Sequence, residues 1–379
     1  MNIILSIAPI RFPLTGIGRY TWELARNLAL QSDLESLLYF SEYKMVSKVP
    51  IAGEHSDLKH WSKRLVQQSA LLTNAYHFLI PKLQKRALKL KDNYLFHGPN
   101  FYLPPFKGKK IATFHDLSLF IRAEDHPPGR VRYAQKEILK TLKKADALIV
   151  DAEYIRQELA SYFNYPLAKI HTVPLAAGEE FRPYTAQETR ATLAHYGLEH
   201  GQYSFYAGTI EPRKNLLTLL DAYEKLPVGL RQQFPLVLSG YKGWLSEEIH
   251  QRIAKANRSG WAKYLGFTPA EHLPALFAGA KLFTFPSLYE GFGLPILEAM
   301  GSGVPVVCSN ASTLPEVAGD AALMALPQDV DAWSELLQQG LTDDQWRAQA
   351  IKRGFLQAAQ FSWARCTEQT MAAYKTLLI

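Results

Sequence analysis

The chain has 379 residues, and 42 Lys or Arg against 35 Asp or Glu give it a formal net charge of +7. Hydrophobic residues make up 47% and charged residues 20%, a balance that excludes a disordered chain and allows two or three packed domains. The two cysteines, Cys308 and Cys366, form no C-x-x-C pair, which argues against a disulfide scaffold and a cysteine zinc site.

Short apolar segments alternate with amphipathic ones along the whole chain. We predict strands at 2–8, 37–40, 94–97, 110–114, 147–150, 170–173, 203–207, 235–238, 262–266, 282–285, 304–308 and 322–325. The helices predicted between them include 18–30, 131–144, 216–223, 247–256 and 295–300. Little polar alternation in the strands is typical of parallel sheets covered by helices on both faces. The pattern restarts after the Pro- and Gly-bearing segment 174–183, which predicts two Rossmann-like domains, 1–178 and 179–361.

One stretch of the first domain is strongly basic. It has no Asp or Glu between residues 58 and 91, but it contains Lys59, Lys63, Arg64, Lys82, Lys85, Arg86, Lys89 and Lys91. Within it, Leu83, Ala87 and Leu90 recur at helical spacing, with cations on the remaining faces. A solvated helix face and a surface that docks on anionic lipid both fit this pattern. Nucleic-acid binding is disfavoured, because no nucleic-acid-binding module accompanies the charge.

Two strand ends of the first domain carry candidate ligand-binding residues. Gly16 and Gly18 follow the opening strand and precede a helix, so they allow either a close approach of an anionic ligand or a plain tight turn. His115 and Asp116 end the strand at 110–114. At the edge of a cleft, His115 can form a hydrogen bond with a substrate hydroxyl, and Asp116 can orient a neighbouring group. The alternative interpretation is that His115 has only a structural role. We expect a similar strand end, residues 95–100 around His97, to line the same cleft.

The second domain offers the two most informative loops. Arg213 and Lys214 follow a strand and Gly208 and precede a helix, an arrangement typical of a diphosphate site. The segment from Phe285 to Met300 runs from a strand through the sequence Glu-Gly-Phe-Gly-Leu-Pro into a helix. Its backbone N–H groups can face phosphate oxygens. Glu290 before the helix and Glu298 one turn inside it can accept hydrogen bonds from sugar hydroxyls at opposite ends of a ligand.

These motifs together resemble the retaining glycosyltransferases of family 4, which have the GT-B fold of two Rossmann-like domains facing across a central cleft. The Glu290-to-Glu298 segment is similar to the E-x7-E motif of that family, and the resemblance extends over nearly the whole chain. It implies that the first domain binds the acceptor and the second the donor, with the C-terminal helix, about 362–379, packed back on the first.

The resemblance also implies roles for individual residues. It assigns the nucleotide ribose to Glu298 and the transferred sugar to Glu290, with His115 near the reaction centre. Arg213 and Lys214 would hold the donor diphosphate. The further donor-binding residues that it implies are Gly16, Gly18, Thr209, Phe292, Gly293 and Leu294.

One position departs from the family pattern. Many members have an arginine directly after the glycine of the Gly208 loop, where this chain has Thr209, which offers only a hydroxyl. The phosphate charge would then rest mainly on Arg213 and Lys214. Two cations and a helix N-terminus can stabilise a leaving diphosphate without a metal. The only D-x-D sequence begins at Asp329 and is interpreted as a helix N-cap, not a metal site.

The resemblance to bacterial polysaccharide and O-antigen mannosyltransferases predicts transfer of mannose from GDP-mannose to a growing glycan or lipid-linked saccharide, with no cofactor. Alternatives are a UDP-sugar transferase of the same fold, a nicotinamide dehydrogenase and a basic binding protein without catalysis. The dehydrogenase is disfavoured because no G-x-G-x-x-G with a following ribose-binding acid is present. We expect a cytoplasmic enzyme, since there is no signal peptide and no apolar run of about 18 residues. The basic segment 58–91 would place it on the inner face of the inner membrane.

Overall fold

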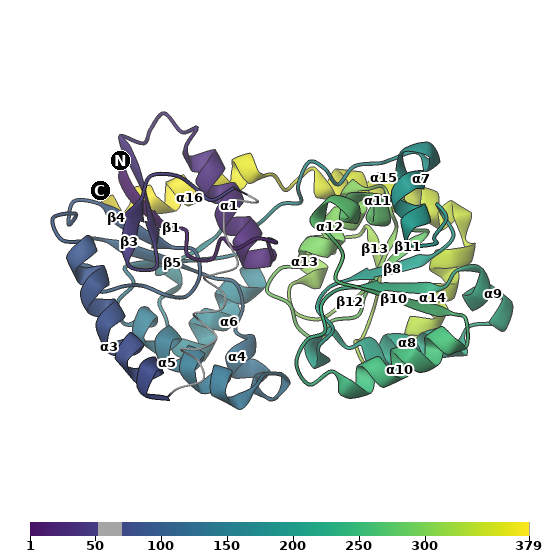
Figure 1. Ribbon diagram of the computed structural model, residues 1–379. Coiled ribbons are helices and arrows are strands. Elements are labelled where there is room, and N and C mark those ends of the chain that lie inside the picture. Colours follow the sequence, from purple (N-terminus) through teal and green to yellow (C-terminus); the bar gives the residue numbers. More distant parts are fainter. Residues whose placement is uncertain (52–69, 379) are drawn as a thin grey trace.

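Two α/β halves lie side by side in the computed structural model, which describes residues 1–51 and 70–378 (Figure 1). The first half is built on a seven-stranded sheet in the order β3-β2-β1-β4-β5-β6-β7. Its strands are β1 (Asn2–Ser6), β2 (Ser36–Ser41), β3 (Lys44–Val46), β4 (Leu95–Gly98), β5 (Lys110–Phe114), β6 (Ala147–Val150) and β7 (Ile170–Thr172). Its helices are α1 (Gly16–Leu28), α3 (Ala70–Ala87), α4 (Ser118–Ile121), α5 (Pro128–Leu142) and α6 (Glu153–Phe163).

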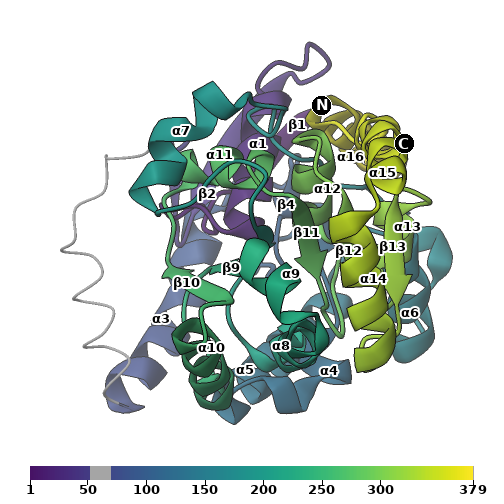
Figure 2. The ribbon, with the colours of Figure 1, turned by 90° about the vertical axis from the view of Figure 1, so that its right-hand side faces the viewer.

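The second half repeats this plan with a six-stranded sheet in the order β10-β9-β8-β11-β12-β13. The strands are β8 (Ser204–Ala207), β9 (Leu236–Ser239), β10 (Ala262–Gly266), β11 (Leu282–Phe285), β12 (Val306–Ser309) and β13 (Ala322–Ala325). The helices are α7 (Ala186–His195), α8 (Leu216–Lys225), α9 (Val228–Gln233), α10 (Glu247–Arg258), α11 (Leu273–Ala278), α12 (Leu294–Gly301), α13 (Leu314–Ala318), α14 (Val330–Thr342) and α15 (Asp344–Ala358). Helices α8 and α10 lie on one side of this sheet, and α11 and α12 lie on the other (Figures 1 and 2).

The strand pattern in the sequence predicts these sheets closely. Strands β5, β6, β10, β11 and β13 have the predicted limits. Every residue of the interior strands β4 and β6 is buried, which explains why their sequences lack polar alternation. Parallel pairing holds everywhere in the described sheets except at the edge, where β3 runs antiparallel to β2. This three-residue strand was not predicted, because it is short and partly exposed and has no apolar run.

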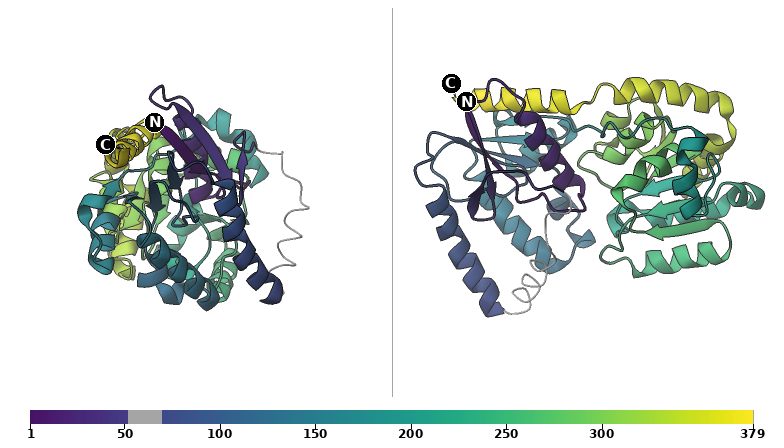
Figure 3. Two further views of the ribbon diagram at one scale, coloured as in Figure 1. Left: turned by 90° about the vertical axis from the view of Figure 1, so that its left-hand side faces the viewer. Right: turned by 45° about the horizontal axis from the view of Figure 1, so that its top comes forward.

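The chain crosses between the halves twice. Residues 173–185 lead into the second half, and the last helix, α16 (Trp363–Leu378), returns to the first half and packs along α1 (Figure 3). Its buried face includes Cys366 and Tyr374. The hydroxyl of Tyr374 lies 2.6 Å from Nδ1 of His97 on β4, so the end of the chain is bonded into the core of the first half.

The described part of the basic segment differs from its prediction. The buried positions are Gln84 and Leu88, whereas Leu83 is 43% exposed and Leu90, just after α3, is 85% exposed. The predicted apolar stripe of Leu83, Ala87 and Leu90 is therefore not the face that packs on the sheet. Gln84 lies there instead because its amide is satisfied by the carbonyl of Glu42 and the hydroxyl of Tyr102. The cations at positions 59, 63 and 64 lie outside the described residues.

No helix among residues 1–51 and 70–378 is long and apolar enough to cross a membrane.

Candidate active site

A cluster of four charged side chains occupies the loops that follow β8 and β11 in the second half. Nζ of Lys214 lies 2.5 Å from Oε1 of Glu290, and Nη1 of Arg213 lies 3.0 Å from Oε2 of the same carboxylate. Nη2 of Arg213 donates to Glu211 at 3.0 Å. Burial alone raises the pKa of Glu290, but the two cations outweigh it and lower that pKa to about 2. The carboxylate is therefore ionised, and two positive and two negative charges balance.

The loop that carries Glu290 is held rigidly by its neighbours. The backbone N–H of Glu290 donates to Oγ of Ser312 at 2.8 Å. Oγ1 of Thr313 donates to the carbonyls of Glu290 and Phe292 at 3.1 and 2.8 Å. Gly293 then turns the chain into α12 with φ of +113°, a conformation that side-chain-bearing residues rarely adopt. Satisfied backbone groups on both sides of Glu290 thus fix the backbone from which its carboxylate projects.

Glu298 lies in α12, one turn beyond the loop, as the sequence predicts. Its carboxylate accepts no hydrogen bond from any residue in the described part of the chain, whereas its backbone carbonyl accepts from the N–H of Ser302. Burial raises its pKa to about 7, opposed only by the charge of Arg19 in the first half. A carboxylate that is short of donors at the edge of a cleft is suited to accept hydrogen bonds from vicinal hydroxyls.

His115, at the end of β5, approaches from the first half. Its Nε2 donates to the carbonyl of Pro99 at 3.0 Å, and its Nδ1 lies 2.6 Å from Oδ2 of Asp151. Burial lowers the pKa of His115, but Asp151 outweighs burial and raises it, which favours the imidazolium. Asp116 accepts two hydrogen bonds from its neighbour Ser118, one from the N–H at 2.9 Å and one from Oγ at 2.7 Å.

Asp151 was missed by the sequence analysis. It follows β6 directly, so the strand-end reasoning that singled out His115 would also have found it. Within the predicted strand end 95–100, His97 itself lies in the core of the first half. His97 is completely buried between Tyr374 and Thr113, and burial lowers its pKa to about 3. The same strand end reaches the cleft through the carbonyl of Pro99 instead.

The two halves meet closely beside these residues. A Cβ on Gly291 would lie 1.9 Å from the carbonyl oxygen of His115, so only glycine allows this approach. Nε1 of Trp244 donates to the carbonyl of Asp125 at 2.6 Å. The carboxylate of Glu316 on α13 accepts from the first two N–H groups of α6, at 2.9 and 3.1 Å. These contacts bring the His115 loop and the Glu290 loop together where the two halves meet.

Comparisons with known proteins bear on what this cleft does. The family described as "Glycosyl transferases group 1" matches residues 194–357, the part that contains the Glu290 cluster. An O-antigen chain mannosyltransferase B of Escherichia coli is 45% identical over 381 residues, covering 100% of both chains. The chain belongs to the group 1 glycosyltransferases.

Other relatives of this glycosyltransferase agree with the fold and the family. A serotype-specific mannosyltransferase WbdA of Escherichia coli is 33% identical over 76% of this chain and 35% of its own. The solved structure of WaaG, titled as a glycosyltransferase of lipopolysaccharide biosynthesis, has a TM-score of 0.71 at 14% identity and covers 98% of each chain. The GT-B fold predicted from the sequence is confirmed.

The remaining donor-binding residues predicted for this glycosyltransferase lie at the starts of helices and in the loop after β8. Helix α1 begins at Gly16, so Gly16 and Gly18 form its first turn and do not precede it. Phe292 is buried against Phe361, with 5.7 Å between ring centroids, which leaves its backbone for any ligand contact. Gly293 and Leu294 start α12, and Thr209 lies in the loop after β8. Asp329 caps α14 by accepting from the N–H of Ala332 at 3.0 Å, as predicted.

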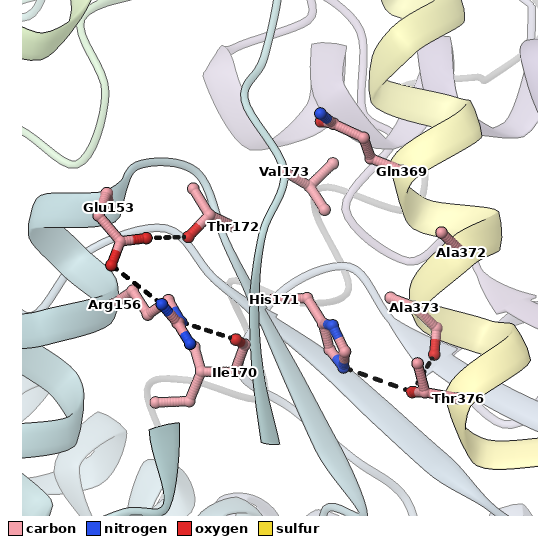
Figure 4. Close-up of a pocket in the computed structure, with 10 residues that line it drawn as sticks. All are labelled: Glu153, Arg156, Ile170, His171, Thr172, Val173, Gln369, Ala372, Ala373 and Thr376. Atoms are coloured by element: carbon pink, nitrogen blue, oxygen red, sulfur yellow. Dashed lines mark hydrogen bonds and ion pairs between the residues drawn. The ribbon is translucent and has the colours of Figure 1, made fainter. Parts of the chain in front are cut away.

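A cavity of about 400 Å³ lies away from this cleft, between α6, β7 and α16 (Figure 4). Glu153, Arg156 and His171 line it, and Nε2 of His171 lies 3.5 Å from Oγ1 of Thr376. None of the predicted site residues contributes to it.

Proposed function

We propose that this glycosyltransferase moves mannose from GDP-mannose, with retention of the anomeric configuration, to the growing glycan of a bacterial O-antigen. The observation that carries the proposal is the full-length similarity, at 45% identity, to an O-antigen chain mannosyltransferase. Three further relatives with 33% identity over at least 71% of this chain are also named as serotype-specific mannosyltransferases. The donor is a nucleotide-diphosphate sugar and no cofactor takes part.

The chemistry of the cleft supports this proposal. Lys214 and Arg213 offer fixed positive charge to a diphosphate, and Glu298 offers a carboxylate to the ribose hydroxyls. Cleavage of the donor leaves negative charge on the diphosphate and produces an oxocarbenium-like sugar. The carboxylate of Glu290 accepts hydrogen bonds from the hydroxyls of that sugar. Preformed charges in a buried site stabilise such a leaving group strongly, so the transfer requires no metal. The leaving phosphate takes the proton of the acceptor hydroxyl as the new bond forms on the same face.

Nucleotide preference gives the first test. Thermal unfolding is followed with GDP, UDP and ADP and with GDP-mannose and UDP-glucose, because a ligand that binds the folded state raises the unfolding temperature. We expect stabilisation by GDP and GDP-mannose only, and transfer of labelled mannose that survives EDTA. Stabilisation by UDP alone would favour a UDP-sugar transferase, and activity that depends on added Mn²⁺ would contradict the metal-independent mechanism.

We further propose that the basic segment 58–91 docks the first domain on an anionic membrane carrying a lipid-linked acceptor. In the described part, exposed Leu79, Leu83 and Leu90 lie beside exposed Lys85 and Arg86, a mixture of apolar and cationic side chains suited to a lipid surface. Co-sedimentation should show salt-sensitive binding to vesicles with phosphatidylglycerol and none to neutral ones. Lys85→Glu with Arg86→Glu should weaken it, whereas equal binding to both kinds of vesicle would reject the proposal.

A further inference from the structure

The side chain of Tyr289 crosses from the second half of the molecule to the first. This residue is 4% exposed, and its hydroxyl accepts a hydrogen bond from the N–H of Leu117 at 3.1 Å. The same hydroxyl donates to the carboxylate of Glu158 on α6. Leu117 lies two residues after His115, so one oxygen atom joins the His115 loop, helix α6 and the loop of Glu290.

The backbone around Tyr289 belongs to the charged cluster. Its carbonyl accepts from Nη1 of Arg213 at 2.6 Å, and the next residue is Glu290. Gly291, two residues after Tyr289, packs against the carbonyl of His115 so closely that a Cβ would not fit. Any change in the position of the Tyr289 ring relative to the first half therefore changes the distance between His115 and Glu290.

We propose that Tyr289 is a positioning residue, whose hydroxyl sets the register between the His115 loop and the Glu290 loop for group transfer. The proposal rests on the proposed function for the identity of the donor. The cleft is built from two separately folded sheets joined by two chain crossings, so its alignment depends on contacts such as this one. A hydrogen bond to a carboxylate is directional and stronger than one between neutral groups, which suits it to fix a distance.

A purely structural tyrosine would behave differently. If the Tyr289 hydroxyl only stabilised the fold, its removal would lower the unfolding temperature and leave the rate of transfer per folded molecule unchanged. A positioning role predicts a lower kcat with unchanged affinity for GDP, because Lys214, Arg213 and Glu298 all lie on the second half.

The test compares Tyr289→Phe with Tyr223→Phe. Tyr223 is an equally buried tyrosine whose hydroxyl bonds Ser204 and the carbonyl of Phe234, all within the second half. We expect Tyr289→Phe to lower kcat about ten- to hundred-fold, the factor implied by one lost bond to a charged group, with the Kd for GDP unchanged. Tyr223→Phe should lower the unfolding temperature without changing kcat.

Hydrogen exchange gives a readout that does not depend on activity. The Leu117 amide donates to Tyr289, so peptides covering 115–121 should exchange about ten-fold faster in Tyr289→Phe and not in Tyr223→Phe. Glu158→Ala removes the bond that the Tyr289 hydroxyl donates to α6, which frees the ring to shift away from Leu117, and it gives the answer should Tyr289→Phe not fold. Glu158→Gln keeps an acceptor oxygen and should lose less activity than Glu158→Ala.

Two results would overturn the proposal. One is unchanged exchange at 115–121 in both Tyr289→Phe and Glu158→Ala. The other is a kcat for these variants equal to that of Tyr223→Phe. Failure of the wild-type protein to turn over GDP-mannose would instead reject the proposed function, and the exchange experiment would still decide whether Tyr289 fixes the His115 loop.

Discussion

Glu298→Gln should make the protein more stable and a poorer binder of nucleotide, and both effects should depend on pH. The pKa of Glu298 is raised by burial to about 7 from an ordinary value of 4.5. Ionising this carboxyl group is therefore harder in the folded protein than in the unfolded chain. The folded state loses stability as pH rises from 4.5 to 7, and it keeps that loss at higher pH.

The magnitude follows from the two pKa values. A difference of 2.5, from 7 to 4.5, corresponds to about 3 kcal/mol at pH 8, as an upper bound because the side chain keeps some contact with solvent. Gln has no charge to ionise, so Glu298→Gln should be more stable than wild type by up to about 3 kcal/mol at pH 8 and nearly equal to it at pH 4. Arg19 does not lose its partners, because it also pairs with Glu180 and Glu23.

The binding of GDP should change in the opposite direction. Under the proposed function, the ribose hydroxyls of GDP donate to the ionised carboxylate of Glu298. Wild-type affinity for GDP should then rise by up to about ten-fold per pH unit as pH approaches 7, and level off above it. Calorimetric titration at pH 6 and 8 measures this rise. Glu298→Gln serves as the control, because it retains the titration of the nucleotide phosphate and loses that of Glu298. Equal pH dependence in the two proteins, or no gain in stability at pH 8, would refute the reasoning.

Three further substitutions test other parts of the structure. Glu290→Gln removes the carboxylate that pairs with buried Lys214, while Arg213 keeps Glu211, so it should cost about 3 kcal/mol of stability. Transfer should fall at least about a hundred-fold, while calorimetry shows GDP bound no more weakly. Turnover equal to that of the wild type would contradict this role. Asp151→Asn removes the charge that raises the pKa of His115, so the imidazole should titrate at lower pH by NMR, and an unchanged titration would reject the pairing. Tyr374→Phe loses the bond to buried His97 and should cost about 1 kcal/mol in chemical denaturation, whereas lost GDP binding would contradict a purely structural role.

The sequence predicted most of the two sheets because their strands are buried on both faces. A run such as Ala147–Val150 has no other plausible place in a folded chain, and its limits are those of β6. The edge strand β3 and the face of α3 were not predictable in the same way. Gln84 occupies a buried position only because distant groups at Glu42 and Tyr102 satisfy its amide, and sequence periodicity carries no information about those groups.

In the candidate site, too, the features set by local structure were predicted and those set by distant parts of the chain were not. Glu290 and Glu298 are separated by one loop and one turn of helix, so local structure alone sets their spacing, and the sequence predicted it. The partners of His115 are different, because Pro99 and Asp151 come from strands β4 and β6 on either side of β5. Tyr289 and Glu158 belong to separate halves and meet only in the assembled cleft. Contacts that depend on how the halves dock were beyond the sequence analysis.

The balance of charge in the Glu290 cluster has a consequence for the order of events at the cleft. Glu211 and Glu290 neutralise Arg213 and Lys214 before any donor arrives. A diphosphate adds further negative charge, so the arrangement is favourable only if Glu290 leaves at least one cation and turns to the hydroxyls of the sugar. Lys214 is the cation better suited to be released, because Arg213 remains bonded to Glu211 and to the carbonyl of Tyr289. Binding of the sugar to Glu290 would then release Lys214 for the leaving phosphate. Recognition of the sugar would thus be coupled to stabilisation of the leaving group.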